Sequence, residues 1–174
     1  MGLALRGTLG EGGMGIVRLA TQRSLGRDVA VKTVKGSQAA ERATGALLRE
    51  ACVMGLLEHP NVVPVYDLVV GDAGEPAIVM RKIEGSSWAS VMHDPAALRA
   101  RFDAEDALEW NLRVLAQVCN VVDFAHSRGI LHRDLKPENV MLGEFGEVYV
   151  VDWGLAVALR EGLGPAIPPL SGSR

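Results

Sequence analysis

The eight residues from His132 to Asn139, HRDLKPEN, restrict this 174-residue chain more than any other feature of its sequence. Five of them are His, Arg, Asp, Lys and Asn, and each of these types occupies about one position in twenty of an average protein. The set would match a given start by chance about 3 × 10⁻⁷ of the time, which excludes coincidence. Asp152-Trp153-Gly154 follows downstream, directly after the apolar run 148–151. A carboxylate at the end of a buried strand needs a cation, so the two segments predict one charged site.

A glycine-rich segment, residues 10–17, matches the pattern GxGxxGxV. Glycine lets backbone amides approach phosphate oxygens closely, whereas a Cβ atom would obstruct them. One match is weak evidence, because dinucleotide-binding folds and glycine-rich turns without function share the pattern. A dinucleotide fold needs a helix after the glycines, but residues 16–21 have the pattern of a strand, and the GK[ST] of a Walker A loop is absent. The segment therefore predicts the tip of a β-hairpin.

Lys32 ends the apolar run 29–31, and Glu50 lies on the apolar-leaning side of a helix predicted at residues 37–57. Taken singly, a strand lysine that extends into solvent and a solvated helix carboxylate are the commoner interpretations. Together the two residues suit an ion pair that directs the ammonium group at phosphates, which requires both side chains in one cleft.

Hydrophobic periodicity predicts a sheet with one helix in the first half of the chain. We expect antiparallel strands at residues 6–10, 15–21, 28–34, 62–70 and 76–83, with a turn at 71–74 and a connector at 83–87. The helix is predicted to bury one face and to expose the other. The buried face holds Leu47, Leu48, Ala51, Met54 and Leu57, and the exposed face holds Glu41, Arg42, Arg49 and Glu58.

The second half begins with a short helical stretch at residues 92–102 and a longer helix that ends near Ser127. Asp103 is predicted to cap the longer helix, with Asp106 at position N3. The residues that keep its 3.6-residue period, and predict its buried face, are Leu108, Leu112, Leu115, Val118, Cys119, Val122 and Ala125. Two short strands around a turn at 143–146 follow, and the aperiodic end of the chain is expected to be disordered.

Composition excludes several classes of protein. With 48% hydrophobic and 22% charged residues the chain is globular, and 18 Lys and Arg against 21 Asp and Glu, without a basic cluster, argue against a nucleic-acid partner. Cys52 and Cys119 form no CxxC pair, so we expect neither a disulfide framework nor a zinc site. This use of cysteine favours a cytoplasmic location. No apolar stretch is long enough for a signal peptide or a membrane span.

The ordered motifs between Arg6 and Ala156 resemble those of the eukaryotic-like (Hanks-type) protein kinases, and among them the bacterial serine/threonine kinases, whose glycine loop often reads GEGGMG. The resemblance implies an α+β, protein-kinase-like fold. Residues 1–86 would form a five-stranded antiparallel small lobe with one helix, and residues 87–156 the beginning of a mostly helical large lobe. Residues 157–174 would start a disordered activation segment.

The same resemblance implies transfer of the ATP γ-phosphate to a Ser or Thr hydroxyl of a protein substrate. Asp134 would be the catalytic base, Lys136 would neutralise the γ-phosphate, and Lys32, paired with Glu50, would bind the α- and β-phosphates. Asn139 and Asp152 would hold Mg²⁺, with Mn²⁺ as an alternative ion. The nucleotide-binding residues would be Gly10, Glu11, Gly12, Gly13, Gly15, Val17, Ala30, Lys32, the gatekeeper Met80, the hinge residues Arg81 and Ile83, and Met141.

Three departures from the family pattern leave alternatives open. Trp153 replaces the usual Phe, which should change packing rather than metal binding, and Arg81 and Lys82 replace the usual acidic and aromatic hinge residues. The Ala-Pro-Glu motif and the helices that follow it in the family are missing after Ala156, so we expect a truncated domain with weak Mg-ATP binding and poor activity. The alternatives are a nucleotide-binding pseudokinase or scaffold, although Lys, Asp and Asn are all retained, and an inactive remnant. The oligomeric state is not indicated.

Overall fold

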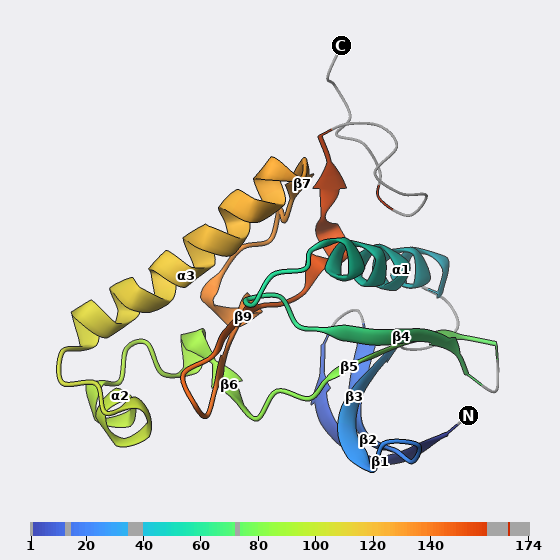
Figure 1. The fold of residues 1–174 in the computed structure, drawn as a ribbon, viewed down its shortest axis with the longest axis horizontal. Helices are drawn as coiled ribbons and strands as arrows, with labels where there is room; N and C mark the ends of the chain where they lie inside the picture. The colour runs from blue at the N-terminus through green and yellow to red at the C-terminus, as the bar shows by residue number, and fades with distance from the viewer. Residues whose placement is uncertain (1, 13–14, 35–39, 72–73, 160–166, 168–174) are drawn as a thin grey trace.

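Five strands form one antiparallel sheet in the computed structural model, which describes residues 2–12, 15–34, 40–71, 74–159 and 167 (Figure 1). They are β1 (Leu3–Glu11), β2 (Gly15–Gln22), β3 (Arg27–Val34), β4 (Val65–Val70) and β5 (Pro76–Arg81), in the order β1-β2-β3-β5-β4. The five predicted strands are therefore confirmed. The fourth begins later than predicted, because residues 62–64 leave the strand pattern before β4 pairs with β5.

The single helix of this half, α1 (Ala40–Leu56), lies against the sheet (Figure 1). Its predicted apolar face is buried except for Leu48, which is half-buried, and Leu47 and Ala51 pack against Ile78 of β5. The prediction for Arg49 is wrong. This residue is half-buried and bonds to the backbone at Gly154, because α1 has a second neighbour besides the sheet that sequence periodicity does not reveal.

The second half starts with β6 (Gly85–Ser87), a 3₁₀ turn η1 (Trp88–Ser90), and the helices α2 (Pro95–Phe102) and α3 (Ala107–Ser127). The predicted cap of α3 is wrong. Asp106, not Asp103, is its N-cap, and its carboxylate accepts from the amides of Leu108 and Glu109. Asp103 instead ends α2 in the left-handed conformation with φ 52°. Both aspartates lie in the short connection between α2 and α3. Asp106 is the one directly before α3, so its side chain reaches the free amides of the first turn of that helix.

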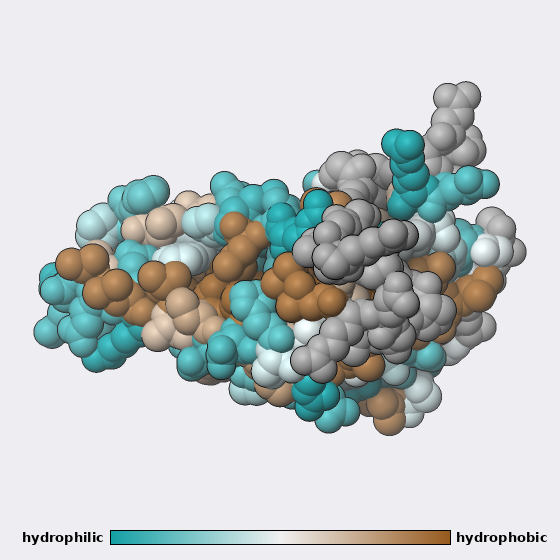
Figure 2. Space-filling view, turned by 90° about the horizontal axis from the view of Figure 1, so that it is seen from above, coloured by the Kyte–Doolittle hydropathy of each residue, from teal (hydrophilic) through white to brown (hydrophobic). Residues whose placement is uncertain are grey.

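The predicted buried face of α3 is partly wrong as well. Val114, Val118, Val121 and Ala125 are buried, whereas Leu108, Leu112 and Leu115 are 69%, 55% and 42% exposed, and Cys119 is exposed. Both sets keep a helical period, so the spacing alone could not decide which stripe meets the core. Figure 2 shows apolar side chains gathered in a band along this part of the surface.

Short elements bring the two charged motifs of the second half together. They are β7 (Ile130–Leu131), η2 (Pro137–Asn139), β8 (Val140–Gly143), β9 (Val148–Val150), η3 (Trp153–Leu155) and β10 (Val157–Ala158). Strand β8 pairs with β9 and with β6, so the predicted connector at 83–87 contains a strand, and the predicted lobe boundary at 86 falls inside it. Strand β10 pairs with β7, so the chain stays ordered just past Ala156, contrary to prediction. Of the rest of the predicted disordered end, residues 160–166 and 168–174 lie outside the described residues, and Ile167 is buried.

One apolar core joins the helical half to α1. It contains Val53, Met54 and Leu57 from the α1 region, Val118 and Val121 from α3, and the fully buried Trp153. No helix within the described ranges is long and apolar enough to cross a membrane.

Candidate functional site

The predicted pair of Lys32 and Glu50 is formed. The Lys32 ammonium donates to both carboxylate oxygens of Glu50, at 2.7 and 2.6 Å, and the two side chains are only 14% and 6% exposed. The lysine comes from the middle of the sheet and the glutamate from the face of α1 that packs on it. Burial raises the pKa of Glu50, and the charge and hydrogen bond of Lys32 oppose this rise.

The segment from His132 to Asn139 forms a compact loop around Asp134. Lys136 Nζ donates to Asp134 Oδ2 at 2.7 Å, and Asn139 Nδ2 donates to the same oxygen at 3.0 Å and to the Asp134 carbonyl at 2.8 Å. The hydrogen bond from Lys136 lowers the pKa of Asp134, and the bond from Asn139 lowers it further against partial desolvation. Asp134 is therefore held as a carboxylate at one fixed position.

His132 holds this loop to the neighbouring chain segment, a role that was not predicted from the sequence. Its Nε2 lies 3.0 Å from the Val151 carbonyl, and its Nδ1 accepts from the Asp134 amide at 3.2 Å. Desolvation by burial lowers the pKa of His132, so the ring is neutral with the proton on Nε2. The imidazole thus ties the Asp134 loop to the strand that leads into Asp152.

Asp152 lies opposite this loop, beside Lys32. Its Oδ1 is 3.9 Å from Lys32 Nζ, and it is a buried oxygen without a hydrogen-bond partner among the residues that the structure describes. The backbone of Asp152 is left-handed, with φ 63° and ψ 61°, as is that of Arg133 with φ 69°. Such conformations are unfavourable for non-glycine residues and persist only where the surrounding structure enforces them, which is typical of ligand-binding sites.

The residues around Asp152 suit a divalent cation shared with a phosphate ligand. Asp152 Oδ1 has the Lys32 ammonium group at 3.9 Å but no hydrogen-bond donor among the described residues, so it is open to a cation. The amide nitrogen of Asn139 is already used by Asp134, which leaves its carbonyl oxygen for an ion. In the described part of the chain no group of three or more His, Cys, Asp or Glu side chains could bind a metal alone. One carboxylate and one amide oxygen, completed by phosphate oxygens, is a set that Mg²⁺ accepts.

The glycines of the β1–β2 hairpin serve different purposes. A Cβ on Gly10 or Gly12 would meet no atom within 4 Å, so these positions leave open space beside the loop. A Cβ on Gly15 would lie 2.3 Å from the Thr33 carbonyl, so this glycine is required by the neighbouring strand β3, a reason that the sequence did not reveal. Glu11 lies in β1 and pairs with Ile16, while Gly13 lies outside the described residues.

The predicted adenine residues are distributed along the same sheet and across the connection to β8. Val17 pairs with Lys32, and Ala30 pairs with the half-buried Met80. Ile83 and Met141 are half-buried against the large core, whereas the Arg81 side chain turns outward to Glu147 at 3.5 Å. Val17, Ala30 and Met80 therefore lie on the strands around Lys32, and contact of the predicted set with a base stays a prediction.

Two further residues connect the site to α1. Arg49 Nη1 donates to the Gly154 carbonyl at 2.6 Å, across 105 positions of sequence. Trp153 is fully buried, donates from Nε1 to the Val150 carbonyl at 3.2 Å and lies 4.5 Å from the His132 ring. The Trp was expected to alter packing under the helix that carries Glu50, and η3 does pack against α1.

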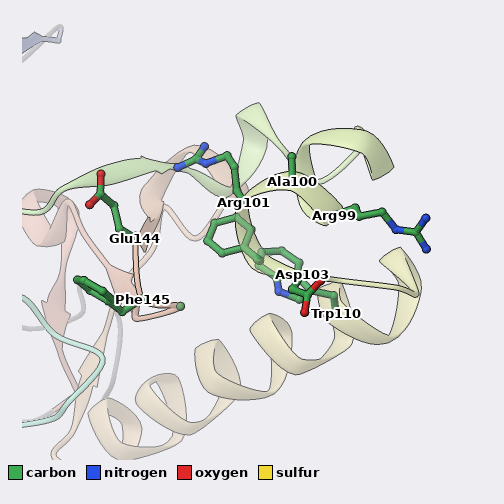
Figure 3. Close-up of a pocket in the computed structure, with 9 residues that line it drawn as sticks. Arg99, Ala100, Arg101, Asp103, Trp110, Glu144 and Phe145 are labelled. Atoms are coloured by element: carbon green, nitrogen blue, oxygen red, sulfur yellow. The ribbon is translucent and has the colours of Figure 1, made fainter.

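A separate cavity of about 400 Å³ lies between α2, the start of α3 and the β8–β9 turn (Figure 3). Phe102 stacks on Trp110 in its wall with 4.8 Å between the ring centres, and Figure 3 shows Glu144 and Phe145 on the opposite side. None of the predicted site residues lines it. Its walls hold two arginines and two acidic residues, so it has no clear charge preference.

Comparison with known families identifies the whole arrangement. Residues 3–165 match the family model of the protein kinase domain. A serine/threonine-protein kinase PknD of Chlamydia trachomatis serovar L2b is 37% identical over 153 residues, which cover 86% of this chain. Proteins of the same name from Protochlamydia amoebophila and Chlamydia caviae are 34% and 36% identical over 154 residues. In each case the match covers 16% of the relative, so the chain spans about one sixth of the length of these proteins.

Proposed function

The chain belongs to the protein kinase domain family, and on that premise we propose that it transfers the γ-phosphate of ATP to a serine or threonine hydroxyl of a protein. Members of this family use ATP and a divalent metal ion. The choice of serine or threonine is supported by the name of the relatives, which are serine/threonine-protein kinases. It is also supported by the Lys136-Pro137-Glu138 sequence after Asp134.

One observation carries the proposal: the Lys32 ammonium group, paired with Glu50, lies 3.9 Å from Asp152 Oδ1, although Lys32 and Asp152 come from different halves of the chain. A phosphate chain needs cations on several sides, and phosphoryl transfer is catalysed mainly by positioning and charge neutralisation. Lys32 supplies one fixed cation, and its pairing with Glu50 holds the ammonium in place.

Asp152 and Asn139 would hold the divalent ion, for which we propose Mg²⁺. When bound, such an ion neutralises phosphate oxygens and orients the transferring group. The fit rests on Asp152 Oδ1, which has no hydrogen-bond partner among the described residues, and on the Asn139 amide, whose nitrogen is fixed by Asp134.

Asp134 acts on the acceptor. The substrate hydroxyl oxygen forms a bond to the γ-phosphorus while its proton passes to the Asp134 carboxylate, and the bond from the γ-phosphorus to the β–γ bridging oxygen breaks, which releases ADP. Lys136 lies 2.7 Å from Asp134 and adds positive charge where the transferred group would pass. The neutral His132 holds the backbone amide of Asp134, and the Asn139 amide holds its carboxylate.

Replacement of Asp134 tests this assignment. In the full-length protein, Asp134→Asn should lower kcat for transfer to a protein substrate by about 10²–10⁴-fold, because general base catalysis is lost. The affinity for Mg-ATP should change little, since Asp134 contacts the acceptor side. Radiolabelled ATP with phosphoamino acid analysis measures the first quantity, and calorimetry measures the second. Full activity of Asp134→Asn, or label on tyrosine alone, would refute the proposal.

A further inference from the structure

Arg49 is the residue next to Glu50 on α1, yet it faces a different part of the site. Its Nη1 donates to the Gly154 carbonyl at 2.6 Å, and its Nε is buried with no hydrogen-bond partner in the described part of the chain. A guanidinium that gives up contact with water at Nε must be held by its remaining bonds. The bond to Gly154 is the one that the structure records for this side chain.

Gly154 belongs to the turn η3 that begins directly after Asp152. A Cβ on Gly154 would lie 3.4 Å from Asp152 Oδ1 and 3.6 Å from the Ala46 carbonyl of α1, so the turn is closely packed between the helix and the carboxylate. Asp152 itself has a left-handed backbone, which needs outside support to persist. The guanidinium group of Arg49 supplies such support at Gly154, two residues after Asp152.

Adjacent residues of α1 therefore hold the two halves of the site. Glu50 fixes Lys32, and Arg49 fixes the backbone that follows Asp152. A charge-assisted hydrogen bond to a desolvated carbonyl is among the stronger single contacts available to a side chain. A shift of α1 would change both halves together.

We propose that Arg49 is a positioning residue, which sets the Asp152 carboxylate for the divalent ion by bonding the Gly154 carbonyl to α1. The inference rests on the proposed function, because it gives Arg49 a task in the metal site of that function. Arg49 acts through the backbone of η3.

The test compares Arg49→Met and Arg49→Lys with Arg42→Met in the full-length protein. Arg42 lies on the same helix and is exposed, so it is a matched control. The first readout is amide hydrogen exchange without nucleotide or metal. The reporter is the Ala156 amide, which donates to the Trp153 carbonyl at 3.0 Å. This amide should exchange about tenfold faster in Arg49→Met than in wild type. Its exchange rate should equal that of wild type in Arg42→Met and should be intermediate in Arg49→Lys.

The second readout is the ratio of ATP affinities measured with and without Mg²⁺. Arg49→Met should reduce this ratio by about tenfold and leave the metal-free affinity unchanged. A loss of packing alone would lower the melting temperature without changing the ratio. If Arg49→Met does not fold, Arg49→Gln, which keeps most of the side-chain stem, carries the same expectations.

The inference is overturned if Arg49→Met equals Arg42→Met in both exchange and magnesium ratio. If the wild-type protein bound ATP equally tightly with and without Mg²⁺, this result would contradict the proposed function instead. In that case the exchange measurement still decides whether Arg49 holds the η3 turn.

Discussion

At the scale of single residues, a short contact sets the charges of Asp134 and Lys136, and burial sets that of His132. The hydrogen bond from Lys136 lowers the pKa of Asp134, and the same contact raises the pKa of Lys136. Burial lowers the pKa of His132. At neutral pH the loop therefore holds a carboxylate, an ammonium group and a neutral imidazole, which is the state that proton transfer to Asp134 requires.

The pH dependence of catalysis should follow the pKa of Asp134. Asp134 must be ionised to accept a proton, so activity is lost as the pH falls through its pKa, and a lowered pKa moves this loss to lower pH. Lys136→Met removes the largest cause of the lowering. The acid limb of kcat/KM against pH should therefore move to higher pH in Lys136→Met and stay in place in Arg113→Met, a cation of α3 that is paired with Glu109. A limb that stays or moves to lower pH in Lys136→Met would contradict this origin of the shift.

Individual residues also show how far the sequence could be interpreted. The partnership of Lys32 and Glu50 could be predicted because each motif position has a known neighbour in the resembling family, and the pair is formed. The bond from Arg49 to Gly154 could not be predicted, since a charged residue at a polar-face spacing is typical of solvent exposure. Only the packing of η3 onto α1 changes that environment.

At the scale of elements, α1 is the structural link between sheet and turn. It packs on β3, β4 and β5 with one face and on η3 with another. The Lys32–Glu50 pair lies in the first of these contacts, and its side chains are almost removed from solvent. The pair therefore stabilises the junction only while both partners are present.

Removal of one partner should be worse than removal of both. Lys32→Met leaves Glu50 buried without a cation, which should cost about 3–5 kcal/mol in the free energy of unfolding. The double variant Lys32→Met/Glu50→Leu should recover most of this loss.

In Lys32→Met the pKa of Glu50 should rise further, so the folded state binds a proton that the unfolded state releases. The stability loss should therefore shrink as the pH falls. Urea unfolding near neutral and at mildly acidic pH measures the recovery in the double variant and the pH dependence in Lys32→Met. A double variant with a lower free energy of unfolding than Lys32→Met would contradict the expectation.

Helix α3 carries two apolar stripes, of which one meets the core. The sequence could predict the helix and its end near Ser127, because the 3.6-residue period is unbroken. It could not predict which stripe is buried, since the valines at 114, 118 and 121 compete with longer leucines at 108, 112 and 115. Tertiary contacts with the residues around β7 and β9 decide in favour of the valines.

Two alanine substitutions distinguish the stripes in the chain of residues 1–174. Val121 is fully buried, so Val121→Ala should lower the free energy of unfolding by about 2 kcal/mol through lost burial and a small cavity. Leu108 is 69% exposed, so Leu108→Ala should stay within about 0.5 kcal/mol of wild type. Denaturant unfolding of both variants checks the assignment, and a larger loss for Leu108→Ala would reverse it.

At the scale of the whole molecule, the site exists because two halves of the chain meet at α1. The sheet and its hairpin bring Lys32 and the glycines, while the elements from β7 to η3 bring Asp134, Asn139 and Asp152. The order and spacing of the motifs were sufficient to predict the fold class and this division of residues. The strained backbone of Asp152 and the pairing of β10 with β7 depend on contacts between distant segments, so local patterns carried no signal for them.

Calorimetric titration of ATP with and without Mg²⁺ tests most directly whether the two halves serve one ligand. The full-length protein should bind ATP more tightly with Mg²⁺. Asp152→Asn should remove this gain and keep the metal-free affinity, because it changes only the carboxylate whose Oδ1 lacks a hydrogen-bond partner among the described residues. Lys32→Met, in contrast, should weaken binding under both conditions, because its ammonium meets the phosphates directly. If magnesium did not affect the wild-type affinity, or if Asp152→Asn kept the full gain, Lys32 and Asp152 would not share a ligand.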